Sequence, residues 1–300
     1  MKLLICTQIV DTEDSYLGFF VRWIEEFSKR TAHVEVICLK EGKHSLPTNV
    51  RVHSLGKEKG ASRVKYILNF YRYIWKLRHD YDAVLVHMNP EYVVLGGLLW
   101  RLLNKRVALW YMHKSVNMKL RIAELFADTI FTASKESFRL KSQKVHIIGH
   151  GIDADFFSPD SSTVRGDWFL SVGRLMPSKR HDLAIRAAVE KGKELRIAGD
   201  GPERQNLEAL ASELGARVQF LGGLTQTQLR DEYRRAARFI HTSETGSLDK
   251  VVLEALACGL PVRTNDPALK ELESVGPEYV REHHSLKNLI PAIVNAICHE

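Results

Sequence analysis

Residues 168–188 read WFLSVGRLMPSKRHDLAIRAA, and this stretch decides how the second half of the chain folds. The run WFLSV is short and largely apolar, which is typical of a buried strand. Gly173 then lets the backbone turn tightly off the strand, and a helical pattern follows over 182–190. The stretch therefore predicts a strand, a tight turn and a helix, the repeating unit of a parallel sheet wound by helices.

The same alternation continues through the rest of the second half. We expect strands at 168–172, 194–198, 218–221, 239–242 and 261–264, and helices at 182–190, 203–214, 225–236 and 249–257. The connections between them are short, so the pattern is that of a doubly wound parallel sheet. In such sheets ligands bind beyond the carboxyl ends of the strands.

The first half repeats this organisation. We expect strands at 3–10, 33–39, 50–54, 83–87, 106–112, 129–132 and 145–148, and helices at 15–29, 63–78, 91–103, 118–126 and 135–141. A chain of 300 residues favours two domains. The polar, turn-rich stretch 151–166 is the expected linker, with domains at 1–155 and 156–300.

Charge is distributed unevenly between the halves. Residues 1–150 hold 24 Lys and Arg against 14 Asp and Glu, whereas residues 151–300 hold 19 against 22. An anionic partner is therefore expected to meet the first half. No motif for nucleic-acid binding accompanies the charge, so an anionic membrane surface or anionic acceptor fits better. The helix at 63–78 interleaves five cations with five aromatic residues, as membrane-surface helices do, although a solvated charged face has the same pattern.

Nothing in the composition indicates a membrane span or a leader. The longest apolar stretches are broken by glycine or arginine, and residues 1–11 read as a first strand rather than a signal peptide. We expect a cytoplasmic protein, with its basic half able to meet the inner face of the membrane. The four cysteines lack metal-ligand spacing and are expected to be reduced, three of them in apolar strand or helix contexts.

Two cations follow the strand at 168–172. Arg174 offers a planar fork of donors and Lys179 a compact point charge, and together they suit a diphosphate. The alternative is a pair of solvated surface cations. The next strand ends in Gly199-Asp200-Gly201-Pro202, where small residues admit a ligand close to the backbone, although such a turn is common without one.

The loop after the strand at 239–242 carries the strongest pattern. It reads SETGSLDK over 243–250 and runs into a helix, so the amides of Gly246, Ser247 and Leu248 lie near a helix N-terminus, where phosphates bind. Glu254 stands about two turns into that helix among apolar residues. A carboxylate there needs hydrogen-bond partners, and ribose hydroxyls are suitable; a partly exposed helix glutamate is the alternative.

These motifs resemble glycosyltransferase family 4. SVGRLMPSKRHDLAIRAA, LRIAGDGPE and TGSLDKVVLEALACGLPV match its nucleotide-binding half in order and spacing. Ala127-Asp128 with Thr132-Ala133-Ser134, and residues 148–156 (IGHGIDADF), are similar to segments of its first half and domain junction. The resemblance implies the GT-B fold, an α/β architecture of two Rossmann-like, doubly wound parallel-sheet domains facing a cleft.

The resemblance also implies a function and a site. The family transfers a sugar with retention from a nucleoside-diphosphate sugar to a glycan, lipid or other acceptor, without an essential metal or a cofactor beyond a UDP-, GDP- or ADP-sugar. By position, Arg174 and Lys179 would bind the diphosphate and, as catalytic candidates, stabilise the charge of the leaving group. Glu254 would bind the ribose. The remaining expected contacts to the donor are Gly173, Gly199, Gly201, Gly246, Ser247, Leu248 and, from the first domain, the catalytic candidate His113, with His87 a weaker candidate.

Three features depart from the family pattern. Gly246 stands where the family often has a glutamate, eight positions before Glu254, so loop backbone or Asp249 would have to supply that sugar contact. His150 replaces the asparagine of the junction motif. The family usually ends with helices that return to the first domain, and this chain stops just after 286–299, which implies a shortened return.

Asp153 and Asp155 sit in the junction segment rather than after a nucleotide-binding strand, so no metal site is expected there. Two rival functions remain open. A sugar-nucleotide epimerase on the same architecture would need carboxylate and histidine acid/base groups in the cleft. A relative that binds nucleotide sugar without transferring it is consistent with Gly246 and the short C-terminus.

Overall fold

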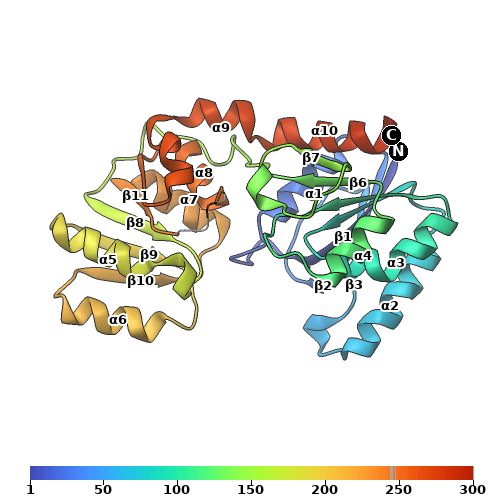
Figure 1. Cartoon of the computed structure of the whole chain (residues 1–300), viewed down its shortest axis with the longest axis horizontal. Helices are drawn as coiled ribbons and strands as arrows, with labels where there is room; N and C mark the ends of the chain where they lie inside the picture. Colours follow the sequence, from blue (N-terminus) through green and yellow to red (C-terminus); the bar gives the residue numbers. More distant parts are fainter. Residues whose placement is uncertain (244–245, 247, 300) are drawn as a thin grey trace. The chain divides into compact units, whose positions relative to one another are not determined.

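The computed structural model describes residues 1–243, 246 and 248–299, which form two compact units (Figure 1). Unit 1 comprises Met1–Gly151 together with Leu286–Glu300, and unit 2 comprises Ile152–Ser285. The expected boundary after residue 155 thus lies close to the observed one. The placement of all of 156–300 in the second domain is wrong, because the last helix belongs to unit 1.

Unit 1 is built on a parallel sheet of seven strands in the order β3-β2-β1-β4-β5-β6-β7. In chain order they are β1 (Lys2–Val10), β2 (His33–Glu41), β3 (Val50–Ser54), β4 (Ala83–His87), β5 (Arg106–Trp110), β6 (Thr129–Thr132) and β7 (Val145–Ile147). Successive residues of β1 alternate between two apolar clusters, with Leu3 and Ile5 in one and Leu4 and Cys6 in the other. Strands buried on both faces in this way are typical of parallel sheets covered by helices.

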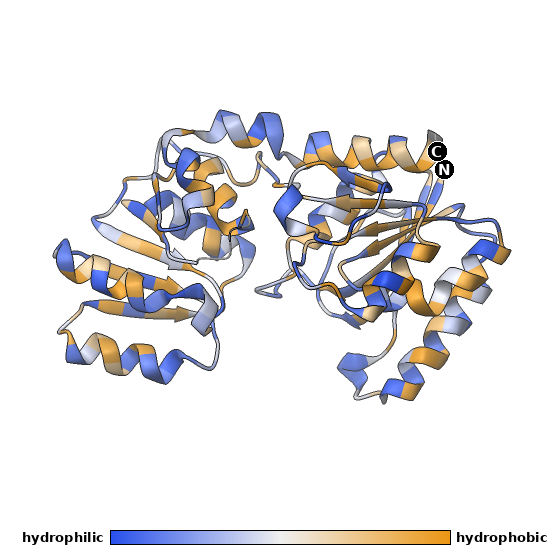
Figure 2. Cartoon of the chain, viewed as in Figure 1, coloured by the Kyte–Doolittle hydropathy of each residue, from blue (hydrophilic) through white to orange (hydrophobic). Residues whose placement is uncertain are grey.

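Helices cover both faces of this sheet. The helices α1 (Phe20–Ser28) and α10 (Leu286–His299) lie on one face, and α2 (Arg63–Lys76), α3 (Pro90–Leu102) and α4 (Met118–Phe126) on the other. Short 3-10 helices are η1 (Lys57–Lys59) and η2 (Lys135–Ser137). Figure 2 shows the apolar stripe of α10 turned toward the sheet.

Apolar burial explains why α10 belongs to unit 1. Leu289, Ile290 and Ile293 are fully buried in the same cluster as Trp23 and Phe27 of α1. Removing such side chains from water stabilises the packed helix by roughly 1.5–3 kcal/mol each. A helix that returns to the first domain is therefore present over Leu286–His299.

Two expected helices of the first half differ from the structure. The helix expected at 15–29 begins only at Phe20, because the Asp14 carboxylate accepts the amides of Tyr16 and Leu17 and holds a turn. The helix expected at 135–141 is the single turn η2, since Phe138 is extended and packs into the core.

Unit 2 contains a parallel five-stranded sheet in the order β10-β9-β8-β11-β12. Its strands are β8 (Trp168–Val172), β9 (Glu194–Ala198), β10 (Val218–Gly222), β11 (Arg238–His241) and β12 (Val262–Thr264). Its helices are α5 (His181–Glu190), α6 (Arg204–Glu213), α7 (Gln226–Arg235), α8 (Lys250–Ala257) and α9 (Pro277–His283), with 3-10 helices η3 (Pro177–Lys179) and η4 (Pro267–Ser274).

The two faces of this sheet have separate cores. Helices α5 and α6 pack on one face, and α7, α8 and α9 on the other. The helix after β8 therefore lies on the opposite face from the helix after the neighbouring strand β11. The two connections diverge at the carboxyl ends of β8 and β11, which is the switch point where open α/β sheets bind ligands.

Cys6, Cys38 and Cys258 are buried free thiols, and Cys298 near the end of α10 is exposed. Burial raises the pKa of the Cys258 thiol to about 12, so it stays protonated at neutral pH. None of the helices that the structure describes is long and apolar enough to cross a bilayer.

Candidate anion-binding site at the switch point of unit 2

The loop after β8 carries the two expected cations. Arg174 is exposed, one residue beyond Gly173, and Lys179 ends the short helix η3. The Thr242 hydroxyl, at the end of β11, donates to the Lys179 carbonyl (3.0 Å). The loops that follow β8 and β11 are therefore joined by a hydrogen bond at Lys179.

The expected glycines allow close backbone packing. Gly173 and Gly199 have φ of +155° and +138°, in the region that favours glycine. A Cβ on Gly199 would lie 2.0 Å from the Gly173 carbonyl oxygen, and one on Gly201 would lie 2.3 Å from the Leu175 carbonyl oxygen. The glycines after β9 thus allow the loop that carries Arg174 to pack directly against their backbone. This role requires no contact with a ligand.

Lys179 is held by a carboxylate from the loop after β11. Its Nζ donates to Asp249 Oδ2 (2.6 Å), and the same oxygen is bonded to His241 Nε2 (3.0 Å). Burial raises the pKa of Asp249, but the His241 hydrogen bond and the Lys179 charge outweigh it and hold the pKa at about 2. Asp249 is therefore a carboxylate across the physiological range.

Sequence reasoning missed His241, Thr264 and Asp266. His241 is buried at the end of β11, and its Nδ1 lies 2.9 Å from the Thr264 hydroxyl, at the end of β12. The available signal was a run of polar residues at the carboxyl ends of two adjacent strands. Asp249, weighed only as a substitute sugar contact, is the partner of Lys179.

Glu254 is more enclosed than expected. The helix α8 begins at Lys250, so Glu254 stands one turn into it rather than two, and its side chain is 1% exposed. Lys250 Nζ donates to Oε1 (2.5 Å) and the Tyr233 hydroxyl donates to Oε2 (3.3 Å). The expected alternative of a partly exposed glutamate is wrong, because the carboxylate is buried with its own protein partners.

The loop between β11 and α8 is only partly described. The Gly246 amide donates to Asp266 Oδ2 (2.6 Å), and its contact with a donor stays a prediction. Leu248 packs against the apolar core of unit 2. Ser247, together with residues 244 and 245, lies outside the described residues.

In unit 1, His113 and His87 have different environments. β5 ends at Trp110, so His113 lies in the following loop, exposed, with Nδ1 accepting from the Ser115 amide (3.1 Å). This bond places the ring hydrogen on Nε2, which is left to donate. His87 is 2% exposed and stacks on Phe20, and burial lowers its pKa to about 3. His87 is thus a core histidine, and its expected role at a sugar is wrong.

No group of three or more His, Cys, Asp and Glu within the described part of the chain is arranged to hold a metal ion. The Asp153 carboxylate accepts the amides of Asp155 and Phe156, which makes it part of a turn. Asp153 thus stabilises a turn in the segment that joins the two units.

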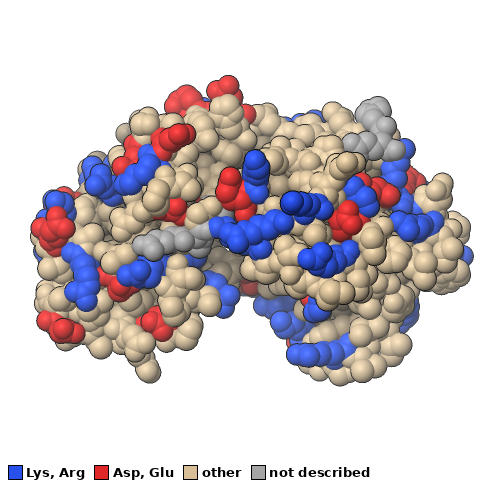
Figure 3. All heavy atoms as spheres, viewed as in Figure 1, with Lys and Arg blue, Asp and Glu red and all other residues tan. Residues whose placement is uncertain are grey.

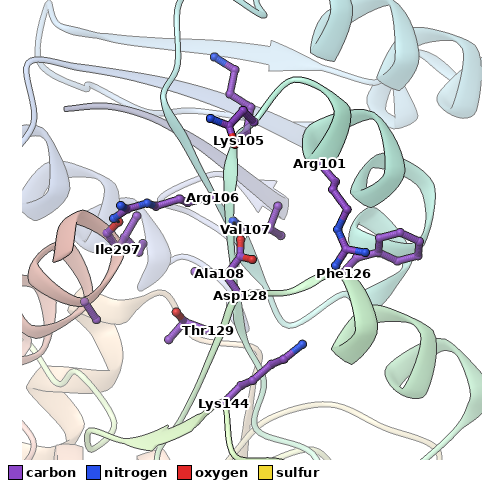
Figure 4. A pocket seen from close by; sticks show the side chains of 12 residues that line it. Arg101, Lys105, Arg106, Val107, Ala108, Phe126, Asp128, Thr129, Lys144 and Ile297 are labelled. Carbon is purple, nitrogen blue, oxygen red and sulfur yellow. Dashed lines mark hydrogen bonds between the residues drawn. The ribbon is translucent and has the colours of Figure 1, made fainter. Parts of the chain in front are cut away.

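Two cavities lie in the structure, and the second is lined in part by Thr242. One of about 490 Å³ opens in unit 1 at the amino ends of β5 and β6, beside four cations (Figure 4). These cations each donate to backbone carbonyls: Arg101 to Leu125, Lys105 to Tyr81, Arg106 to Ile297, and Lys144 to Glu124 and Ala127. The other, of about 560 Å³, lies beside α5 in unit 2. None of the expected site residues lines either cavity.

Comparison with known families relates both halves of the chain to glycosyltransferases. Residues 158–281 match the family model described as Glycosyl transferases group 1, and residues 10–129 match Glycosyl transferase 4-like. The gpi3 subunit of phosphatidylinositol N-acetylglucosaminyltransferase from Schizosaccharomyces pombe is 33% identical over 132 residues, 41% of this chain and 29% of that protein. D-inositol 3-phosphate glycosyltransferase from Mycobacteroides abscessus is 36% identical over 137 residues, 40% and 31% of the two chains. This chain spans less than a third of either relative in these matches.

Solved structures share the fold over the whole chain. HepE from Anabaena, crystallised with UDP and glucose, has a TM-score of 0.75 at 15% identity and is covered in full, as is this chain. Sucrose-phosphate synthase from Thermosynechococcus elongatus has a TM-score of 0.70 at 18% identity, over 99% of this chain and 91% of that one. The expected fold class, GT-B, is confirmed.

Proposed function

We propose that this chain, which belongs to the group 1 glycosyltransferases of the 4-like type, transfers a sugar from a nucleoside-diphosphate sugar to an acceptor. The observation that carries the proposal is the placement of Arg174 and Lys179 on the loop after β8, at the switch point of a parallel sheet. The positive charges of these two side chains match the negative charge of a diphosphate. The neighbouring turns, which are built from glycine, would lie close to a diphosphate bound there.

Each residue has a proposed role. Arg174 and Lys179 stabilise the charge that develops on the diphosphate as the sugar leaves, which lowers the barrier without a metal. His113 of unit 1 has an Nε2 hydrogen left to donate, and the family resemblance gives it a role toward a sugar. Glu254 accepts the ribose hydroxyls through the acceptor capacity that its bonds to Lys250 and Tyr233 leave, and for this the enclosed side chain has to become accessible. We propose retention of configuration, and no protein nucleophile is assigned.

The acceptor is proposed to be a glycan or a lipid-linked molecule of the cell envelope, bound by unit 1. The nucleotide sugars that would serve as donors are UDP-, GDP- and ADP-sugars. We place the reaction in the cytoplasm, at the inner face of the membrane.

A donor panel tests the transfer. The protein is incubated with radiolabelled UDP-, GDP- and ADP-sugars together with a mixture of glycan and lipid-linked acceptors. Incorporation of the sugar into acceptor, nucleotide release and donor binding are followed. Release of a nucleoside diphosphate with the sugar transferred supports the proposal. Binding without turnover would replace it with a binding module, and a changed sugar on an intact donor with an epimerase. Lys179→Ala is expected to lower turnover at least a hundredfold; the exposed Lys191 serves as the matched control.

Helix α2 supports contact with an anionic membrane. Phe70 and Ile74 face the core, and a second apolar stripe at helical spacing faces outward: Val64 (67% exposed), Leu68 (64%), Tyr71 (41%) and Trp75 (53%). Arg63, Lys65, Arg72 and Lys76 are on the same helix. Figure 3 shows Lys and Arg side chains gathered over the visible face of unit 1. Apolar side chains beside cations suit the interface of a membrane with anionic lipids.

Vesicle pelleting tests this contact. We expect the protein to pellet with phosphatidylglycerol vesicles and much less with phosphatidylcholine vesicles at low salt, and Leu68→Ser to weaken the binding. Leu125→Ser, at an exposed leucine of α4, is the matched control. Equal pelleting with both vesicles would exclude the anionic surface as the partner.

A further inference from the structure

A chain of hydrogen bonds runs from the edge of the unit 2 sheet to Lys179. It begins at the Asp266 amide, which donates to Thr264 Oγ1 (3.1 Å), and continues from Thr264 to His241 Nδ1 (2.9 Å). From His241 Nε2 it passes to Asp249 Oδ2 (3.0 Å), which also accepts from Lys179 Nζ (2.6 Å). The links other than that of Lys179 to Asp249 are of ordinary hydrogen-bond length, and that ion pair is shorter, as bonds between charged groups are.

The direction of each bond follows from what the groups can donate. The Asp249 carboxylate only accepts, so His241 must donate from Nε2. In the neutral ring, Nδ1 then accepts a hydrogen bond from the Thr264 hydroxyl. The oxygen of that hydroxyl in turn accepts a hydrogen bond from the Asp266 amide. Both ring nitrogens of His241 are thus bonded in one consistent arrangement, which fixes the plane of the ring.

The Asp249 side chain takes part in this chain of hydrogen bonds instead of capping helix α8. It occupies the N-cap position of α8, where an aspartate usually accepts an amide of the first turn, yet its side chain makes no cap hydrogen bond. The carboxylate is turned instead toward Lys179 and His241, so its orientation serves the lysine rather than the helix.

We propose that His241 is a positioning residue for the donor site: it orients Asp249, and Asp249 holds the Lys179 ammonium where the donor diphosphate binds. The inference rests on the proposed function of Lys179. His241 is 4% exposed and is separated from Lys179 by the carboxylate, so it acts through that carboxylate.

Lys179 needs such support because of where it lies. It is the last residue of the one-turn helix η3, and its side chain is a quarter exposed. A four-carbon stem in that setting samples many rotamers, and each rotamer lost on binding weakens the interaction. Asp249 at one end, and the Thr242 bond to the Lys179 carbonyl at the other, confine the lysine before the ligand arrives.

Two substitutions of His241 separate positioning from packing. Phenylalanine fills the site but donates nothing to Asp249, whereas the amide nitrogen of glutamine can reach the position of Nε2. UDP, GDP and ADP are titrated into the wild-type protein by calorimetry, and the tightest of them is the probe. We expect His241→Phe to raise its Kd about tenfold or more, and His241→Gln to recover most of the loss. Melting temperatures of all variants are recorded.

A double-mutant cycle with Lys179→Met decides how His241 acts. If His241 works through Lys179, His241→Phe has little further effect on the Kd of the probe once the lysine is gone. His87→Phe is the matched control: it too removes a buried histidine bonded to a threonine, in unit 1, and is expected to leave the Kd unchanged.

The outcomes separate the two proposals. If the wild-type protein binds none of the three nucleotides, the proposed function fails with the inference. If it binds one of them and His241→Phe binds it equally well, only the positioning role is overturned. Equal losses in the wild-type and Lys179→Met backgrounds also overturn it, since they show a general effect on the fold.

Discussion

Glu254 is a charged side chain enclosed in the apolar core of unit 2. A substitution there can therefore change the stability of the fold as well as ligand binding. Alanine would remove the carboxylate that accepts the bonds from Lys250 and from the Tyr233 hydroxyl. Removing one partner of a buried ion pair typically costs about 3–5 kcal/mol. An activity loss in Glu254→Ala would therefore report on folding as much as on the ribose.

The informative substitution is Glu254→Gln, which keeps the shape and one acceptor. If the carboxylate accepts ribose hydroxyls, this variant binds nucleoside diphosphate about tenfold more weakly, because bonds to a charged acceptor exceed those to an amide. Calorimetry measures the affinity, and thermal unfolding shows that the fold persists. Unchanged affinity in a folded variant would remove Glu254 from the site.

Asp249 allows a prediction about pH. Its pKa in the folded protein is about 2, below the ordinary value of 3.8, so its contribution to stability is complete above about pH 4 and is lost as the pH falls toward 2. The shift corresponds to roughly 2 kcal/mol. Carboxyl NMR titration is expected to show this low pKa and, in Lys179→Met, a rise toward 3.8. A pKa near 3.8 in the wild-type protein would contradict the ion pair.

The loops after β8 and β9 act as one element. A Cβ on Gly199 would meet the Gly173 carbonyl, so Gly199→Ala must displace the loop that carries Arg174 and Lys179. We expect it to cost ~2 kcal/mol or more of unfolding free energy and also to weaken nucleotide binding. Urea unfolding and calorimetry measure the two effects.

Gly192→Ala is the control for this prediction. Gly192 has a φ of +62°, but a Cβ there has no atom within 4 Å. Its cost is therefore only the backbone strain of about 1–2 kcal/mol, with nucleotide affinity unchanged. Equal effects of the two substitutions on affinity would show that the contact between loops is unimportant.

For the whole molecule, the last helix stabilises the first unit. Ile293→Ala removes a fully buried side chain of α10 from the cluster around Trp23, at an expected cost of about 2–5 kcal/mol. Hydrogen exchange is expected to increase in β1 and α1 and to stay unchanged in the unit 2 sheet. Leu272→Ala, within the core of unit 2, should show the reverse pattern. Increased exchange in unit 2 for Ile293→Ala would contradict the assignment of α10.

Buried histidines in both units predict sensitivity to acid. Burial lowers the pKa of His87 to about 3 and of His181 to about 4, whereas the unfolded chain takes up these protons near pH 6.5. Stability is therefore lost as the pH falls below about 6.5, by up to ~1.4 kcal/mol per pH unit for each histidine. Urea unfolding between pH 7 and 4 measures the slope, which His87→Phe should reduce. An unchanged slope would show that His87 is protonated in the folded state.

Local patterns predicted most of the architecture. Apolar runs of strand length and the turns between them depend on neighbouring residues only, so both parallel sheets and the loop bearing Arg174 and Lys179 could be read from the sequence. The start of α1 and the short turn η2 could not, because Asp14 and Phe138 make contacts that compete with helix propensity.

The stretch 168–188 by itself determined a strand, a glycine turn and two cations ahead of a helix, because spacing along the chain sets these features. Only the tertiary structure decided what surrounds Lys179: β11 lies beside β8, which brings Asp249 and His241 to the lysine from residues far along the chain. The return of α10 to unit 1 has the same origin. Such contacts depend on which strands and faces become neighbours, and burial of apolar surface across the whole fold selects those neighbours.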